Sequence, residues 1–191
     1  IHTYSGPAWL GIDAGSTTTK LALITADGGL LYTYYHSNLG NPVAIVLEQL
    51  RTIYAMCGDR IVIRGAAVTG YGEDLIKNAF SCDLGLVETM AHYKAAAHFQ
   101  PDVDFIIDIG GQDSKVILLD PSGGQVKDFL MNDKCAAGTG RFLEMMARTL
   151  ELSLEEISTI GLQWKEEITI SSMCTVFAES EIVSLLSTGA D

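Results

Sequence analysis

The sequence has no cluster of basic residues and no long apolar run, and each absence excludes a class of protein. Among 191 residues, Asp and Glu outnumber Lys and Arg 24 to 12, which gives a formal net charge of −12. Nucleic-acid binding requires clustered cations that neutralise phosphates, so nucleic acid is not an expected partner. No stretch approaches the roughly 20 apolar residues of a membrane-spanning helix, so we expect no membrane segment.

Cysteine is also scarce, and no CxxC pair occurs. The chain has four cysteines, Cys57, Cys82, Cys135 and Cys174. This number is too small for a secreted disulfide scaffold, so we expect the reducing environment of the cytoplasm. The first residues, "IHTYSGPAWLGID", contain neither an initiating Met nor a basic leader. We therefore interpret the chain as part of a longer protein.

The most informative feature that the sequence does contain is an internal repeat. The segment "IDAGSTTTKLALITADGG" (12–29) matches "IDIGGQDSKVILLDPSGG" (107–124) without gaps at an offset of 95 residues. Each copy has an apolar strand, a polar turn with glycine, a second apolar strand and a Gly-Gly turn, which is the pattern of a β-hairpin. The matched pairs include Asp13 and Asp108, Gly15 and Gly110, and Lys20 and Lys115.

Two such hairpins predict an α/β protein with two related lobes, residues 1–100 and 101–191, each a mixed sheet with helices on its faces. Apolar spacing predicts helices over 40–58, 72–80, 88–99, 140–152 and 175–187. Further strands are predicted over 61–72, 125–132 and 166–172, together with a buried strand over 104–111.

The first hairpin turn carries side chains that suit a polyphosphate. Asp13 is followed by Gly15, by four hydroxyl residues, Ser16, Thr17, Thr18 and Thr19, and by Lys20. Amides, hydroxyls and a cation on one turn suit phosphate oxygens, and a carboxylate there suits a hydrated Mg²⁺. The Walker A pattern does not occur. The alternative is a Thr-rich turn that serves strand formation alone.

The second turn repeats this chemistry with Asp108, Gly110, Gly111, Gln112 and Asp113. Two such turns around one Mg²⁺-nucleotide suit phosphoryl transfer, which depends mainly on positioning and on charge stabilisation. Gln112 and Asp113 are the candidates for orienting an attacking water. Lys115 is left without a role, because an outward-pointing strand residue is an open alternative. The "VTGYG" segment is either a turn that borders the site or a purely structural one.

Cys135 and Cys174 each lie between a predicted strand and a predicted helix. Amides at a helix start favour a thiolate, so we expect the positive end of each helix to face the sulfur. The residues alone leave four interpretations open: an inert thiol, a nucleophile with a distant base, a disulfide partner and a metal ligand. Two thiolates do not complete a zinc or iron–sulfur site, but two from each of two symmetric subunits do.

The segments "GIDAGSTTTK" and "DIGGQDSK" resemble the phosphate-binding hairpins of the actin, Hsp70 and sugar-kinase ATPases. This resemblance implies two ribonuclease H-like lobes. The Gly-Gly adenosine segment that those proteins carry near their C-terminus is not found here, so we expect the second lobe to be truncated.

"NDKCAAGTGRF" and "SSMCTVFAESE", taken with "DIGGQDSK", resemble the activators (component A) of 2-hydroxyacyl-CoA dehydratases and the ATPase subunits of benzoyl-CoA reductase. The resemblance implies an ATP-dependent activase that takes an electron from ferredoxin or flavodoxin and passes it to a dehydratase or CoA-ester reductase. It also implies a homodimer that holds one [4Fe–4S] cluster through Cys135 and Cys174 of each subunit. Cys57 and Cys82 match no such motif and are expected to be packing residues.

The implied site has three parts. Asp13 and Asp108 hold Mg²⁺ through water and, with Gln112, carry the hydrolysis of ATP. The nucleotide is bound by Gly15, Ser16, Thr17, Thr18, Lys20, Gly110, Gly111 and Gln112. The alternative functions are a small-molecule kinase of the same fold and a non-catalytic nucleotide-sensing module of a larger protein. The acyl-CoA that is processed downstream is not indicated.

Overall fold

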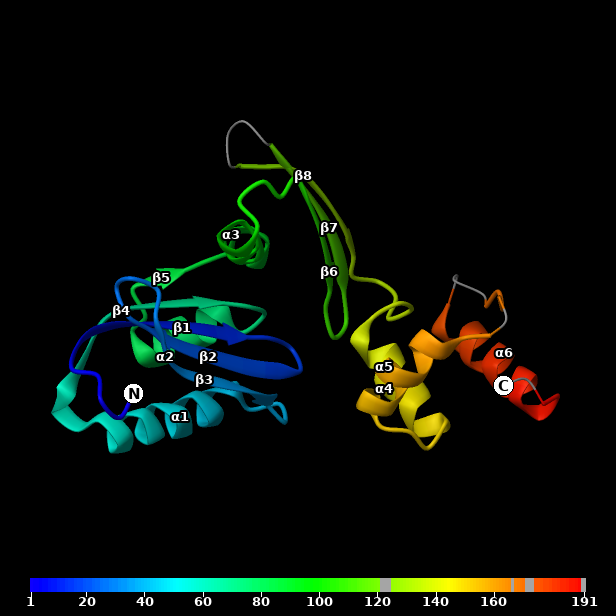
Figure 1. Ribbon diagram of the computed structural model, residues 1–191, viewed down its shortest axis with the longest axis horizontal. Coiled ribbons are helices and arrows are strands. Elements are labelled where there is room, and N and C mark those ends of the chain that lie inside the picture. Colours follow the sequence, from blue (N-terminus) through cyan, green and yellow to red (C-terminus); the bar gives the residue numbers. More distant parts are fainter. Residues whose placement is uncertain (121–124, 166, 171–173, 190–191) are drawn as a thin grey trace. The chain divides into compact units, whose positions relative to one another are not determined.

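The computed structural model describes residues 1–120, 125–165, 167–170 and 174–189. The chain divides into two compact units, Ile1–Pro101 and Asp102–Asp191 (Figure 1). No helix in the described part of the chain combines the length and apolarity that a membrane crossing needs.

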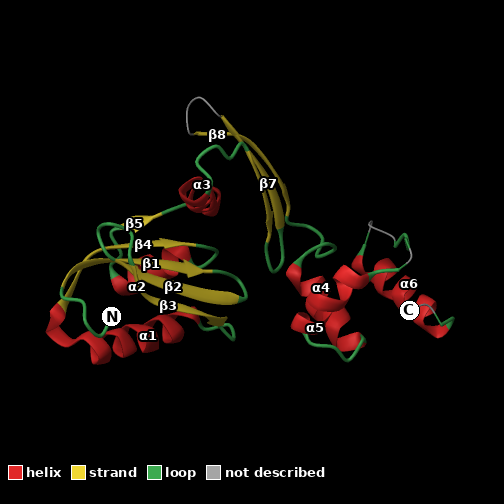
Figure 2. Ribbon diagram, in the orientation of Figure 1, coloured by secondary structure: helices red, strands yellow, loops and turns green. Residues whose placement is uncertain are grey.

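The first unit is built on a five-stranded mixed sheet with the order β3-β2-β1-β4-β5 (Figure 2). Its strands are β1 (Gly6–Ala14), β2 (Thr18–Ile24), β3 (Leu30–Ser37), β4 (Ile61–Thr69) and β5 (Leu84–Gly85). β1, β2 and β3 form an antiparallel meander, whereas β4 runs parallel to β1 and β5 runs parallel to β4. The first repeat copy therefore forms the predicted hairpin, β1 and β2.

The helices of the first unit are α1 (Pro42–Cys57), α2 (Glu73–Phe80) and α3 (Glu88–Phe99), and a 3₁₀ turn, η1 (Gly58–Arg60), follows α1. All three helices occur where the apolar spacing predicts them. The start of α1 is fixed by Asn41, whose side chain accepts a hydrogen bond from the Ala44 amide, and by Pro42 in the first turn.

Alternation along β1 places Ala8, Leu10, Ile12 and Ala14 in the core of the first unit. Val46 and Ile53 of α1 and Ile76 of α2 belong to the same core cluster, so both helices pack on one face of the sheet. Cys57 and Cys82 are also buried in this cluster, which confirms that they are packing residues. Burial, assisted by the nearby Asp83 carboxylate, raises the pKa of the Cys82 thiol and keeps it neutral.

The second unit contains a three-stranded antiparallel sheet, β6 (Phe105–Ile109), β7 (Ser114–Asp120) and β8 (Gln125–Asn132), with β7 in the centre. Its helices are α4 (Gly140–Thr149), α5 (Leu154–Ile160) and α6 (Thr175–Ser187), and a 3₁₀ turn, η2 (Gly161–Gln163), follows α5. The second repeat copy supplies β6 and β7, and α4 and α6 begin where they were predicted.

Two predictions for the second unit are wrong in their extent. The helix predicted over 140–152 ends at Thr149, because Glu151 adopts a positive φ of 56° that turns the chain into α5. The strand predicted over 166–172 is absent from its described part, 167–170, and its other residues lie outside the described ones. A strand needs a hydrogen-bonded neighbour, and the described part of the chain gives 167–170 none.

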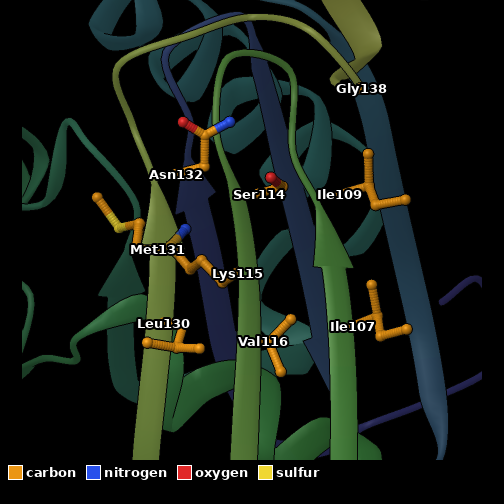
Figure 3. A pocket seen from close by; sticks show the side chains of 9 residues that line it. All are labelled: Ile107, Ile109, Ser114, Lys115, Val116, Leu130, Met131, Asn132 and Gly138. Atoms are coloured by element: carbon orange, nitrogen blue, oxygen red, sulfur yellow. The ribbon is translucent and has the colours of Figure 1, made fainter. Parts of the chain in front are cut away.

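The strand predicted to be buried over 104–111 forms as β6, but it is an edge strand with one exposed face. Ile107 is 63% exposed, and Ile109 on the same face is 60% exposed. With Val116 and Leu130 they line a shallow apolar pocket (Figure 3). The prediction of burial was wrong. An apolar sequence indicates which side chains favour burial, but burial also requires another element that packs over them.

Ile53 tests the core of the first unit, because its side chain is fully buried in α1. We expect Ile53→Ala to lower the free energy of unfolding by about 2–5 kcal/mol, since it removes buried methylenes and leaves a cavity. Leu47→Ala, at an exposed position of the same helix, should have a much smaller effect. Urea denaturation measures both variants, and equal losses would contradict this packing.

Candidate functional site

The first repeat turn brings a carboxylate and an ammonium group together at one end of the sheet. Asp13 on β1 pairs in register with Lys20 on β2, and the Lys20 Nζ lies 2.8 Å from the Asp13 Oδ2. The two side chains are 29% and 37% exposed, so water screens this ion pair. The pair is therefore accessible to a ligand that approaches the turn.

Asn38 holds the first turn through hydrogen bonds to two of its carbonyls, a role that the sequence did not indicate. Its buried side-chain amide donates a hydrogen bond of 2.8 Å to the Gly15 carbonyl, and its backbone N–H donates one to the Thr17 carbonyl. A trans peptide directs its N–H opposite to its C=O, so the Ser16 amide points away from Asn38. The available signal was a polar residue directly after β3 and two positions before the Gly-Asn pair that precedes α1.

The "VTGYG" turn after β4 lies directly against Asp13. Gly70 has a φ of +98°, and a Cβ there would stand 2.6 Å from the Ala14 carbonyl oxygen and 2.7 Å from the Asp13 Oδ1. The Gly72 amide donates a hydrogen bond of 2.8 Å to the same Ala14 oxygen. This turn therefore borders the Asp13 carboxylate, and only glycine fits at position 70.

The second repeat turn has the same register and one more carboxylate. Asp108 on β6 pairs with Lys115 on β7. The Lys115 Nζ lies 2.8 Å from the Asp113 Oδ2 and 3.7 Å from the Asp108 Oδ2. Lys115 is buried, so the alternative of an outward-pointing strand residue is wrong. The pairing with two carboxylates explains why burial of this ammonium group is tolerated.

The remaining predicted binding residues lie on the same two turns, except Thr18, which is the first residue of β2. Gly15, Thr17 and Thr18 are partly buried, and Ser16 is exposed at the tip of the first turn. On the second turn Gly110 and Gly111 are partly buried and Gln112 is exposed. Each unit therefore presents one Asp–Lys pair beside a turn that contains glycine.

The helix that follows the Cys135 loop is hydrogen-bonded to the second turn. The first two amides of α4, those of Gly140 and Arg141, donate hydrogen bonds of 2.9 Å to the carbonyls of Gly110 and Gly111. We expected these amides to face the sulfur of Cys135, and that expectation is wrong, because backbone carbonyls of the second turn occupy them. Cys135 is therefore linked to the second turn through a short stretch of main chain.

Cys135 and Cys174 are free, partly exposed thiols. Cys174 is the N-cap residue of α6, and Asn132 donates a side-chain hydrogen bond of 3.0 Å to the Cys135 carbonyl. Among the described residues, no three His, Cys, Asp or Glu side chains gather into a metal site. Two thiols from one chain fit half of the four-thiolate donor set of an iron–sulfur cluster, and a second subunit would have to supply the other half.

A family model described as the BadF/BadG/BcrA/BcrD ATPase family matches residues 10–191. The 2-hydroxyisocaproyl-CoA dehydratase activator of Clostridioides difficile is 40% identical over 182 residues, which cover 95% of this chain and 66% of the relative. The activator of lactoyl-CoA dehydratase of Anaerotignum propionicum is 43% identical, with 94% and 68% covered. The chain thus spans about two thirds of the length of these curated relatives.

Two solved structures of dehydratase activators are similar to this chain. The activator of the 2-hydroxyisocaproyl-CoA dehydratase from Clostridium difficile with bound ADPNP has a TM-score of 0.83 at 38% identity, covering 96% of this chain and 67% of that structure. Component A of the (R)-2-hydroxyglutaryl-CoA dehydratase of Acidaminococcus fermentans has a TM-score of 0.84 at 34% identity, with 97% and 70% covered.

Gly70 provides a test of the contact between the "VTGYG" turn and Asp13. We expect Gly70→Ala to destabilise the protein more than Gly28→Ala, by at least about 1 kcal/mol in the free energy of unfolding. Both glycines have a positive φ, but a Cβ at Gly28 would meet nothing within 4 Å, whereas one at Gly70 would collide with Ala14 and Asp13. Chemical denaturation compares the two, and equal losses would rule out the collision.

Proposed function

Because this chain belongs to the BadF/BadG/BcrA/BcrD ATPase family, we propose that it is the nucleotide-binding part of an ATP-dependent activator of a 2-hydroxyacyl-CoA dehydratase or a related CoA-ester reductase. The predicted family and the predicted α/β fold of the actin and Hsp70 ATPases are both confirmed. Its partner is then a dehydratase or reductase, as the names of its relatives suggest.

The observation that carries this proposal is the repeated Asp–Lys pair beside a glycine turn, once in each unit. An ATPase must hold phosphates by amides and cations and must hold Mg²⁺ by carboxylates or their waters. Both turns contain these groups, and a related structure was solved with bound ADPNP. The proposed ligands of ATP are Gly15, Ser16, Thr17, Thr18, Lys20, Gly110, Gly111 and Gln112.

The geometry suggests how the first turn would receive a nucleotide. Asp13 is paired with Lys20 in a partly exposed ion pair. Asp13 would hold a hydrated Mg²⁺ through one of its waters, and Lys20 would bind a phosphate oxygen. Asp108 would hold Mg²⁺ through water on the second turn. Gln112, exposed at the tip of that turn, would orient the attacking water.

For the cysteines we propose that Cys135 and Cys174 of two subunits together hold one [4Fe–4S] cluster in a homodimer. Such a cluster accepts and donates one electron at a low potential. In this proposal the electron comes from ferredoxin or flavodoxin and passes to the dehydratase or reductase. Two free, partly exposed thiols at or just before helix starts support the assignment, and free thiols also suit the reducing cytoplasm.

Nucleotide binding can be tested by titrating the full-length protein with ADPNP and Mg²⁺. We expect Lys20→Met to raise the Kd at least about tenfold, because a hydrogen bond to a charged group contributes about 1.5–3 kcal/mol. Lys94→Met, which removes an exposed cation on α3, should leave the Kd unchanged. An unmutated protein that neither binds ADPNP nor hydrolyses ATP would refute the proposed activity.

The cluster assignment can be tested by purifying the full-length protein without oxygen and measuring iron, sulfide and the absorption spectrum. We expect about four irons per dimer, since two cysteines from each subunit complete a four-thiolate site. Cys135→Ser and Cys174→Ser should each abolish the iron, whereas Cys57→Ala should retain it. A fully loaded cluster in either serine variant would overturn the assignment of the ligands.

A further inference from the structure

The two repeated Asp–Lys pairs differ in burial. Lys20 is 37% exposed, whereas Lys115 is 6% exposed. Both lysines lie in the same register opposite the aspartate of their hairpin. Their surroundings therefore separate two side chains that the repeat makes equivalent.

The two lysines have different side chains beside them on the neighbouring strands. Lys20 lies beside Tyr35 of β3, whose ring centre is 5.6 Å from the Lys20 Nζ, and Tyr35 is itself exposed. Lys115 lies on the central strand of its sheet, between β6 and β8, where it is paired with Met131 (Figure 3). Both lysines therefore have a neighbouring strand on each side, β1 and β3 for Lys20 and β6 and β8 for Lys115. The Lys115 ammonium group differs in that it lies within 4 Å of two carboxylates at the turn.

The second carboxylate is the feature that has no counterpart in the first hairpin. Asp113 occupies the position that Thr18 occupies in the first copy. Its Oδ2 is the nearer partner of Lys115, at 2.8 Å, and its main-chain carbonyl accepts a hydrogen bond of 2.9 Å from the Gly110 amide. A Cβ on Gly110 would collide with the Asp113 Oδ1. Asp113 is therefore folded against its own turn.

Charge and burial together decide which lysine can leave its partner. Removing a buried ammonium from two nearby carboxylates leaves uncompensated charge and is strongly unfavourable. A half-exposed pair is held only weakly, because water competes for both groups. Lys20 is thus able to move to a phosphate, and Lys115 is held at the carboxylates.

We propose that Lys115 is a positioning residue of the hydrolysis site, which fixes Asp108 and Asp113 on the second turn and does not itself bind phosphate. The inference rests on the proposed ATPase function and divides the two lysines into a mobile ligand, Lys20, and a fixed structural cation, Lys115. The second turn also receives the first amides of α4. Its geometry, and with it the place of Gln112, depends on this cation.

The experiment compares Lys115→Met, Lys115→Arg and Lys20→Met in the full-length protein, with ADPNP for binding and ATP for turnover. We expect Lys115→Met to change the Kd for Mg²⁺-ADPNP by less than about threefold and to lower kcat by about 10²-fold, as for displaced reacting groups. Lys115→Arg should restore much of the turnover. Lys20→Met should mainly raise the Kd. A Kd that rises as much in Lys115→Met as in Lys20→Met, or an unchanged kcat, would overturn the proposal.

A second measurement stays informative if a variant folds poorly or if the unmutated protein does not hydrolyse ATP. A double-mutant cycle of Lys115→Met and Asp113→Asn, followed by chemical denaturation without nucleotide, measures the coupling of the pair. We expect it to exceed the coupling of Lys20→Met with Asp13→Asn, and the double variant to be more stable than Lys115→Met alone. Equal couplings would show that Lys115 is not a fixed cation. Absence of turnover in the unmutated protein would refute the ATPase function and leave this comparison valid.

Discussion

The antiparallel register of the two repeated hairpins is the constraint on which the candidate site depends. In each copy the aspartate near the end of one strand pairs with the lysine seven positions later, which lies on the next strand beyond the turn. A shift of one residue would move either side chain to the opposite face of its sheet. The glycines, hydroxyls and amides of the turns matter only because this register places a carboxylate and a cation beside them.

Each turn is held from outside by groups that contribute no chemistry of their own. In the first unit, Asn38 takes up the carbonyls of Gly15 and Thr17, and Gly70 closes against Asp13. In the second, Gly140 and Arg141 bind the carbonyls of Gly110 and Gly111. These contacts orient the turn amides, and the last of them joins the Cys135 loop to the second turn.

The periodicity of apolar residues predicted most of the elements, because helices and strands bury one face at a fixed spacing. α1, α2 and α3 were predictable in this way, and the repeat located both hairpins. The errors arose where local pattern and tertiary surroundings diverge. Residues 167–170 alternate like a strand but find no neighbouring strand in the described chain, and β6 is apolar yet exposed at Ile107 and Ile109.

The sequence by itself determined the family, the fold class and the residue types of the turns, because repeats, spacing and short motifs are properties of the chain order. It could not show that Lys20 and Lys115, which occupy equivalent positions in the repeat, differ in burial. Nor could it indicate that Asn38 and the start of α4 serve the turns. The tertiary structure decided these points, because burial and hydrogen bonding depend on which strands and loops surround a side chain.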